Sequence, residues 1–284
     1  MIGVRQDVKI LRPCREQDYN EFIWNNKDKV IYGPVASRRL GNSLGINLFP
    51  EGKLCDFHCV YCDCNSGQEN KTFAPLDHIL EEIKDGFLIH QQKGTQIDYI
   101  TFAGNGEPTL HSHFPEVVQH VLQLRLELFT DTPIAIFTNC MNLHKPKVEK
   151  AISQLDEIYF KLDAADQDTL QRINRPSDKR KLTEIIAQIS KFNSPRISSA
   201  VIEKPARLSN MASLCSKNFA ELLNSMNAST LYLYTIDYPT DSQEIRSVPL
   251  RKLVEMAKTI NSFSGPPVRV LTSNFLESEV VEYE

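Results

Sequence analysis

The chain has 284 residues, of which 41% are apolar and 24% are charged, and its formal net charge at pH 7 is −4. This balance is ordinary for a globular protein of one or two domains and argues against collagen-like, disordered and secreted chains. The negative charge argues against a surface dominated by polyanion binding. No apolar run approaches the roughly 18–20 residues that span a bilayer, and charges interrupt the N-terminus where a signal peptide would be apolar. We therefore expect a cytoplasmic protein without a membrane segment.

Residues 1–32 are mixed in character and carry several charges, so we interpret them as an N-terminal extension packed on the outside. The core domain then spans 33–284 and ends in a C-terminal tail. From Leu44 onwards, β-branched or aromatic runs alternate with helix-period segments. The predicted strands are Leu44–Phe49, Asp98–Phe102, Ile134–Thr138, Ile158–Leu162, Ile197–Ile202 and Leu231–Ile236. The predicted helices are Leu76–Lys93, Phe114–Phe129, Lys145–Leu155, Leu182–Phe192, Ala212–Met226 and Pro249–Phe263.

Six repeats of strand and helix predict an α/β fold with a parallel sheet and helical crossovers. A partly closed barrel and an open doubly wound sheet both satisfy this alternation. In either fold, ligands bind at the carboxyl ends of the strands, so the loops after the strands are where we expect a site.

Cysteines cluster directly after the first predicted strand. Four of the seven fall within ten positions, at Cys55, Cys59, Cys62 and Cys64. In a chain without an export signal, clustered thiols bind metal or do chemistry more often than they form disulfides. The remaining three are interpreted as small buried apolar residues: Cys14, Cys140 and Cys215.

The spacing C-x3-C-x2-C of Cys55, Cys59 and Cys62 brings three thiolates together from one short loop. Soft thiolates suit zinc or iron–sulfur clusters. Three ligands on a cuboidal four-iron cluster leave one iron open to a small molecule. The alternative is a closed structural zinc site with Cys64 as the fourth ligand, although Cys62-Asp-Cys64 is tight for zinc spacing. His58, between the ligands, is expected at the surface.

This C-x3-C-x-aromatic-C loop, with Tyr61 as the aromatic residue, resembles the radical S-adenosylmethionine (SAM) superfamily. The resemblance implies that Cys55, Cys59 and Cys62 bind a [4Fe–4S] cluster. The open iron would then chelate the amino and carboxylate groups of SAM. The resemblance also implies a partial (β/α)6 barrel of the TIM type, which agrees with the six strand–helix units.

A second motif, Ala103-Gly-Asn-Gly-Glu-Pro-Thr109, follows the second predicted strand. Gly104 and Gly106 let the backbone approach a ligand closely, and Glu107 offers an acceptor for a cation. These three residues are similar to the family turn that holds the SAM ammonium. The alternative is a glycine-rich turn in which Glu107 lies at a helix start and favours the helix dipole.

Period two places Tyr159, Lys161 and Asp163 on one face of a strand. If that face points into the barrel, Lys161 meets the SAM carboxylate and Asp163 the ribose. The alternative is an internal ion pair between Lys161 and Asp163. Thr138-Asn139, at the end of the third strand, is a further candidate contact. His111 and His113 are expected to be capping or surface residues.

Further segments resemble one branch of the superfamily, the bacterial iron–sulfur oxidoreductases related to the tRNA wyosine synthases. They are Gly33–Gly45, Thr101–His111, Leu162–Ala164, Ile173–Pro176 and Tyr234–Asp237. The wyosine synthases carry a second cluster on three upstream cysteines, whereas this chain has only Cys14 there. A second cluster is therefore not expected.

The resemblance implies an enzyme whose cluster reductively cleaves SAM to a 5′-deoxyadenosyl radical, which abstracts hydrogen from an unidentified substrate. A flavodoxin or ferredoxin would supply the electron. One alternative is a module that binds the cluster and SAM without turnover. Another is a tRNA-modifying enzyme, for which basic residues are available at Arg172, Arg175, Lys179, Arg180 and Lys181, and in Ser37-Arg38-Arg39. A solvated helix start also explains the first of these groups.

Overall fold

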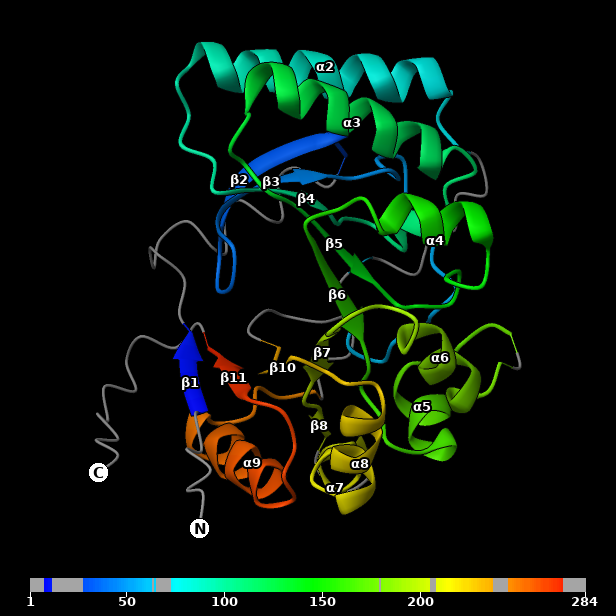
Figure 1. The fold of residues 1–284 in the computed structure, drawn as a ribbon, viewed down its shortest axis with the longest axis vertical. Helices are drawn as coiled ribbons and strands as arrows, with labels where there is room; N and C mark the ends of the chain where they lie inside the picture. Colours follow the sequence, from blue (N-terminus) through cyan, green and yellow to red (C-terminus); the bar gives the residue numbers. More distant parts are fainter. Residues whose placement is uncertain are drawn as a thin grey trace.

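The computed structural model describes residues 8–11, 28–62, 64, 73–178, 180–204, 208–236 and 245–272. At its centre lies a nine-stranded sheet in the order β1-β11-β10-β7-β6-β5-β4-β3-β2 (Figure 1). Neighbouring strands of this sheet are parallel except in the antiparallel β2–β3 hairpin. The strands of the sheet are β1 (Val8–Leu11), β2 (Ile31–Ser37), β3 (Gly41–Ile46), β4 (Tyr99–Phe102), β5 (Ile134–Thr138), β6 (Glu157–Lys161), β7 (Arg196–Ala200), β10 (Thr230–Tyr234) and β11 (Val268–Leu271). A separate small hairpin pairs β8 (Glu203–Lys204) with β9 (Leu208–Ser209).

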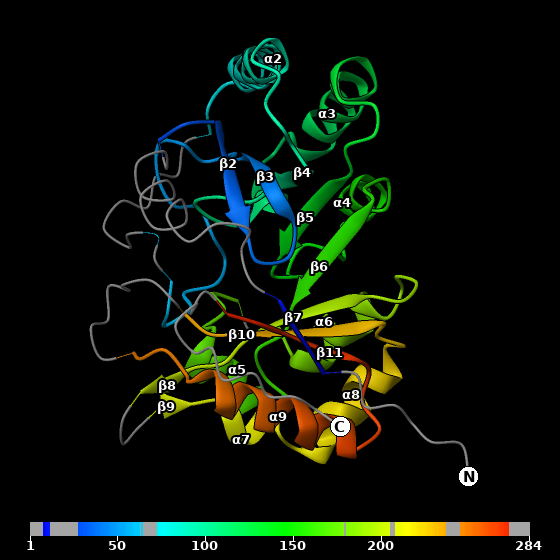
Figure 2. The ribbon, with the colours of Figure 1, turned by 90° about the vertical axis from the view of Figure 1, so that its left-hand side faces the viewer.

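Helices connect the parallel strands and cover one face of the sheet. They are α2 (Leu76–Gln92), η1 (Pro108–Leu110), α3 (Phe114–Leu128), α4 (Pro146–Ile152), α5 (Gln167–Ile173), α6 (Leu182–Ile189), α7 (Met211–Leu214), α8 (Lys217–Ser225) and α9 (Leu250–Ser262). In Figure 2 they form an arc from α2 and α3 at the top, past α4, to α9 at the bottom, and the sheet follows the inside of this arc. The fold is therefore a curled half-barrel, which confirms the predicted partial barrel.

The two faces of the sheet differ because side chains alternate along each strand. Ile100, Phe102 and Ile134 are fully buried in the main hydrophobic cluster, together with helix residues such as Ile83 and Val121. The opposite face carries polar and aromatic side chains and looks into the concave side, which we call the barrel interior. Its members include Ser43, Thr101, Phe137, Tyr159, Lys161, Ser198, Tyr232 and Tyr234.

Each of the six predicted strands is present, as β3, β4, β5, β6, β7 and β10, with boundaries within three residues of those expected. Strands β2 and β11 and helix α5 were not predicted. The prediction of a single helix over 212–226 is wrong, because the helical backbone is interrupted after Cys215 and two helices, α7 and α8, form instead. Ser216 begins α8 there, and its hydroxyl accepts a hydrogen bond from the Phe219 amide at 3.1 Å.

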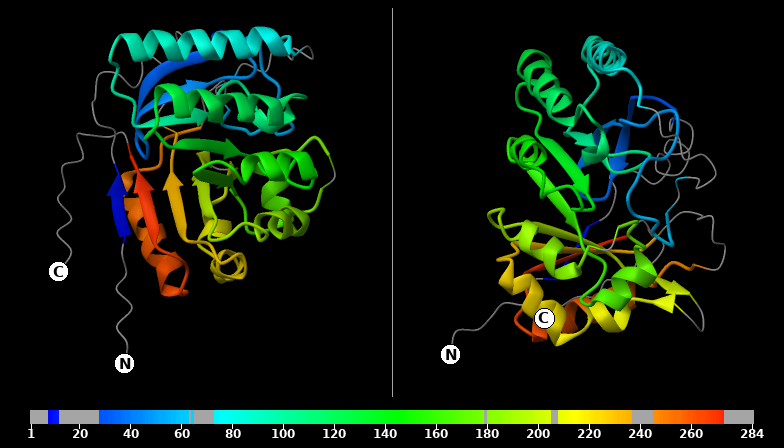
Figure 3. Two further views of the ribbon diagram at one scale, coloured as in Figure 1. Left: turned by 45° about the horizontal axis from the view of Figure 1, so that its top comes forward. Right: turned by 90° about the vertical axis from the view of Figure 1, so that its right-hand side faces the viewer.

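Among the described residues of the first 32, Val8–Leu11 form β1, and β2 begins at Ile31. β1 pairs in parallel with β11 at the edge, as the left view of Figure 3 shows. The remaining positions of the expected extension up to residue 27, Cys14 among them, and the tail 273–284 lie outside the described residues. The division into 1–32 and 33–284 stays a prediction. Within the described ranges, no helix combines the length and the apolar character that a membrane crossing requires.

Candidate active site

The cysteine loop (residues 53–62) follows β3 at the carboxyl edge of the sheet. The backbone of this loop is fixed on both sides. The Glu107 amide donates to the Leu54 carbonyl at 2.9 Å, and the Val60 amide donates to the Ile173 carbonyl at 2.9 Å. The loop is therefore held between the turn after β4 and the end of α5, which are far from it and from each other in sequence.

Amide nitrogens approach the Cys55 and Cys59 thiols. The Phe57 amide lies 3.4 Å from Cys55 Sγ, and Asn139 Nδ2 lies 3.7 Å from the same sulfur. Asn174 Nδ2 lies 3.4 Å from Cys59 Sγ. N–H donors to cysteine sulfur favour thiolate ligation and set the potential of a bound iron–sulfur cluster. The carboxamides come from the ends of β5 and α5, so the donors are part of the scaffold.

Burial keeps these thiols protonated in the ligand-free chain. It raises the pKa of Cys55 well above its usual value and the pKa of Cys59 to about 11, the latter against the opposing charge of Lys161. Metal binding therefore has to release protons from these thiols. The donor set, three soft sulfurs with N–H donors on two of them, fits an iron–sulfur cluster.

Cys64, the fourth of the clustered cysteines, lies beside the turn after β4. Cys64 Sγ is 3.8 Å from the Gly104 carbonyl, and Cys62 Sγ is 3.9 Å from the Cys64 carbonyl. Within the ranges that the structure describes, no three Cys, His, Asp or Glu side chains are grouped so that they could hold a single metal ion.

The two glycines of the turn after β4 make room for the cysteine loop. Both have left-handed backbone angles, with φ +154° at Gly104 and +156° at Gly106. A Cβ on Gly106 would overlap the Leu54 carbonyl, and one on Gly104 would overlap the Asn47 side chain. Since Leu54 and Gly106 also form a β-bridge, glycine at 106 is required for the contact between the two loops.

The Glu107 carboxylate is 2% exposed and is surrounded by donors. It accepts from the Thr109 amide at 3.2 Å, the Thr109 hydroxyl at 2.5 Å, the Thr138 hydroxyl at 2.8 Å and the Asn139 amide at 2.6 Å. Burial nevertheless raises the pKa of Glu107 to about 7. Glu107 caps η1, so these contacts agree with the alternative in which Glu107 lies at a helix start. Its contact with SAM stays a prediction.

Lys161 and Asp163 face the barrel interior and form an ion pair at 3.1 Å. Asp163 also accepts from Tyr61 Oη at 2.5 Å, Asn174 Nδ2 at 2.6 Å and the Ala200 amide at 2.8 Å. Burial alone would lower the pKa of Lys161, but Asp163, Tyr234 and Cys59 together outweigh burial and raise that pKa. The internal pair that the sequence left open is thus present, and contacts of either residue with SAM stay predictions.

Tyr61 joins the cysteine loop to β6 and β10. Its ring lies 4.8 Å from Lys161 Nζ, and Lys161 also donates to Tyr234 Oη at 3.1 Å. Tyr61 is 5% exposed, and burial raises its pKa, with the Asp163 carboxylate adding to the shift. The aromatic position of the motif is therefore a structural link between the thiols and the charged pair.

Other expectations divide into those met and those corrected. His58 is exposed and Cys140 is buried, as expected, while Cys215 is half-buried. His111 is the capping residue at the end of η1, and its Nδ1 accepts a hydrogen bond from the His113 amide at 3.3 Å, so the capping alternative is met for His111 and the surface alternative is not. This side chain is 2% exposed and packs beside the rings of Phe49 and Phe73.

Two contributors were not anticipated as site residues. Asn174 was expected only as part of a family-like segment, yet it bridges Cys59 and Asp163. Arg39 was expected only as a basic residue within such a segment, yet it lies inside the barrel beside the Phe137 ring. The available signals were the family-like segments Ile173–Pro176 and Gly33–Gly45, which contain these two residues.

The superfamily model of radical SAM proteins matches residues 52–202, which is just over half of the chain. The chain belongs to the radical SAM superfamily. The matched segment begins just before the cysteine loop and includes the turn after β4 and the Lys161–Asp163 pair. Membership in this superfamily supports SAM-cleaving radical chemistry in general.

Two curated relatives place the chain more narrowly. A protein of Helicobacter pylori in the UPF0026 family is 31% identical over 219 residues, which cover 74% of this chain and 67% of that protein. The chain therefore also belongs to the UPF0026 family. A protein of Brachyspira hyodysenteriae named GTPase Obg is 35% identical over 170 residues, which cover 58% of this chain. The chain spans about a quarter of that protein, 24% of its length.

Solved structures confirm the half-barrel. SuiB of Streptococcus suis, bound to its precursor peptide, matches with a TM-score of 0.59 at 14% identity, covering 79% of this chain and 48% of that one. TYW1 with a lysine-pyruvate adduct matches with a TM-score of 0.57 at 14% identity, covering 78% and 73%. At these identities the similarity establishes the fold.

Proposed function

We propose that this chain is an enzyme that reductively cleaves SAM at a [4Fe–4S] cluster held by Cys55, Cys59 and Cys62. The observation that carries the proposal is the set of N–H donors on the Cys55 and Cys59 sulfurs in a loop fixed on both sides. When bound, the cluster and SAM together supply one-electron cleavage of a carbon–sulfur bond and, from it, hydrogen abstraction.

The residues around the loop would orient SAM. A lysine ammonium has three donors, and Asp163 and Tyr234 take two of those on Lys161. The third donor would bind the SAM carboxylate. Asp163 already accepts from four groups, so its main contribution would be to hold Lys161 and Tyr61 in place. Gly104, Gly106 and Glu107 would receive the SAM ammonium along their turn.

The reaction needs an external electron, and we propose a flavodoxin or ferredoxin as its source. The buried Tyr61 beside the half-buried Cys59 would limit the access of water to the reacting atoms. The substrate belongs to the barrel interior, in front of Lys161.

The decisive experiment is release of 5′-deoxyadenosine. Protein purified without oxygen and reconstituted with iron and sulfide is given SAM and dithionite. We expect release from the wild-type chain and from Cys215→Ala, since Cys215 is half-buried beside α8 and away from the loop. Cys59→Ala should show release at background only.

The alternatives give different results. A cluster that forms but never cleaves SAM, beside a related enzyme active in the same assay, would favour a binding module. Zinc without iron or sulfide, lost in Cys64→Ala, would favour the structural zinc site. A tRNA-modifying enzyme would keep SAM cleavage and add salt-dependent tRNA binding.

A further inference from the structure

Arg39 lies at the tip of the β2–β3 hairpin, and its guanidinium is surrounded by aromatic rings. Its central carbon is 4.8 Å from the ring centroid of Phe137, 5.1 Å from Tyr159, 5.2 Å from Tyr232 and 5.5 Å from Tyr234. These rings belong to β5, β6 and β10. The side chain therefore reaches across the barrel interior to strands far along the sheet from its own hairpin.

Among the described residues, no anion matches the charge of this guanidinium. Arg39 Nη1 donates to Ser198 Oγ at 3.0 Å. In the described part of the chain, no Asp or Glu oxygen lies within ion-pair distance of Arg39. Burial lowers the pKa of Arg39. A guanidinium has five N–H donors, and aromatic faces satisfy its charge only in part.

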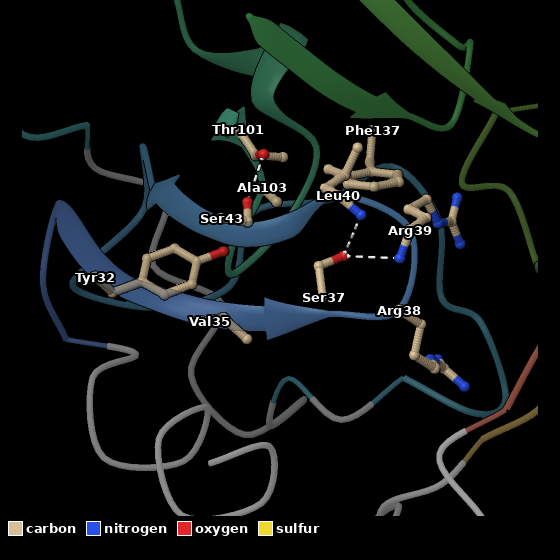
Figure 4. Close-up of a pocket in the computed structure, with 10 residues that line it drawn as sticks. All are labelled: Tyr32, Val35, Ser37, Arg38, Arg39, Leu40, Ser43, Thr101, Ala103 and Phe137. Carbon is tan, nitrogen blue, oxygen red and sulfur yellow. Dashed lines mark hydrogen bonds between the residues drawn. The ribbon is translucent and has the colours of Figure 1, made fainter. Parts of the chain in front are cut away.

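A cavity of about 220 Å³ opens beside this side chain (Figure 4). Arg38, Arg39 and Phe137 line one end, and the hydroxyls of Ser43 and Thr101 lie in hydrogen-bond contact at 2.6 Å along the wall. The cavity thus combines two cationic side chains with hydroxyls and an aromatic face. This is the lining expected for a small polar molecule with a negative group.

The cavity lies on the amino-terminal side of the candidate active site. Tyr159, which packs on Arg39, and Lys161 share the inner face of β6 two residues apart, or about 7 Å along the strand. Lys161 is the member nearer the cysteine loop. A molecule anchored at Arg39 would therefore extend toward the thiols, with its uncharged part next to the reacting atoms.

We propose that the substrate is a small molecule with a carboxylate or phosphate group, and that Arg39 binds this group in the barrel interior. The assignment of this ligand as the substrate rests on the proposed function, whereas anion binding at Arg39 does not. The guanidinium fork pairs with either anion through two parallel hydrogen bonds.

The test uses modification of arginine by butanedione, followed by peptide mass spectrometry on the reconstituted wild-type protein. Succinate, inorganic phosphate and tRNA are added in separate arms, each against sodium chloride at the same ionic strength. We expect saturating succinate or phosphate to slow modification of Arg39 at least about threefold. Arg196, which pairs with Glu157 and is 36% exposed, is the internal control and should react at an unchanged rate.

The arms separate the outcomes. Protection by succinate assigns a carboxylate, and protection by phosphate assigns a phosphate group. No protection, or equal protection by chloride or at Arg196, overturns the proposal, and protection by tRNA alone overturns the small-molecule assignment. Release of 5′-deoxyadenosine is measured on the same sample, so failure of SAM cleavage is seen separately from failure of anion binding.

A variant gives a second readout. Succinate or phosphate should raise the melting temperature of the wild-type protein, and Arg39→Met should abolish this rise. Lys191→Met, which removes an exposed cation paired with Glu149, should retain it. If Arg39→Met does not fold, the modification experiment on the wild-type protein still decides the proposal.

Discussion

Charged side chains have different partners at the carboxyl edge of the sheet and in the middle of the barrel. At the edge, the carboxylates of Asp163 and Glu107 are each surrounded by protein donors. In the middle, Arg39 meets aromatic rings and one hydroxyl. Asp163, whose charge the protein satisfies, holds Lys161 and Tyr61 in place. A buried charge without a protein counter-charge indicates where a ligand supplies it.

The strongest way to test this contrast is Asp163→Ala. The change leaves Lys161 buried without its counter-charge and removes the acceptor for Tyr61 and Asn174. We expect the free energy of unfolding of the cluster-free protein to fall by about 3–5 kcal/mol in urea titrations. Glu149→Ala, which breaks the exposed pair with Lys191, should cost below about 1 kcal/mol. Equal losses would contradict a scaffold role for Asp163.

Gly106→Ala tests how the edge is assembled. The new Cβ would overlap the Leu54 carbonyl, so the cysteine loop has to move. We expect a loss of about 2–4 kcal/mol in unfolding free energy, together with reduced iron retention. Gly94→Ala is the control, because Gly94 has φ +59° but no atom within 4 Å of the added Cβ. The free energy of unfolding of that variant should fall by about 1 kcal/mol, and the variant should keep its iron. Equal losses in the two variants would contradict a role for the contact between Gly106 and Leu54.

His111 provides a pH test at the same edge. Burial lowers its pKa from 6.5 to about 4, and its Nε2 has no hydrogen-bond partner in the described structure. Between these values the unfolded chain binds a proton that the folded chain does not, so this residue makes stability fall as pH drops from about 6.5 to about 4. His111→Phe should reduce the fall in the free energy of unfolding between pH 6.5 and pH 4 by on the order of 2 kcal/mol, measured by urea titrations of cluster-free protein. An unchanged slope would show that His111 is not buried neutral.

The smallest effect is expected in the middle of the barrel. Without added anion, Arg39→Met should change the free energy of unfolding by less than about 1 kcal/mol, because it removes a charge that has no protein counter-charge. The measurement is the same urea titration in chloride buffer. A loss as large as that of Asp163→Ala would make Arg39 part of the scaffold and remove the contrast.

The sequence was sufficient for the elements whose signals are local. Strand β5 and helix α2 have unbroken apolar periodicity, and both were located to within one residue. The C-x3-C-x2-C spacing also lies within one loop, and the role of its three thiols as cluster ligands stays a prediction. These features depend on neighbouring residues, which is the range over which periodicity and spacing operate.

The rest depends on contacts between distant segments. Arg39 meets rings about 100 to 200 positions away, and no local pattern around it predicts an aromatic enclosure. Asn174 reaches Cys59 only because the end of α5 packs on the cysteine loop. The break before Ser216 was missed because the apolar period continues through it, and the serine cap overrides that period.

The most direct test of the central claim is electron paramagnetic resonance of the reconstituted protein, reduced by dithionite, with and without SAM. The account predicts a reduced-cluster signal that changes shape when SAM is added, because one iron lacks a protein ligand. Cys59→Ala should lose the signal. A signal of the wild-type protein that SAM leaves unchanged would contradict an open iron, and protein that binds zinc in place of iron would contradict the cluster itself.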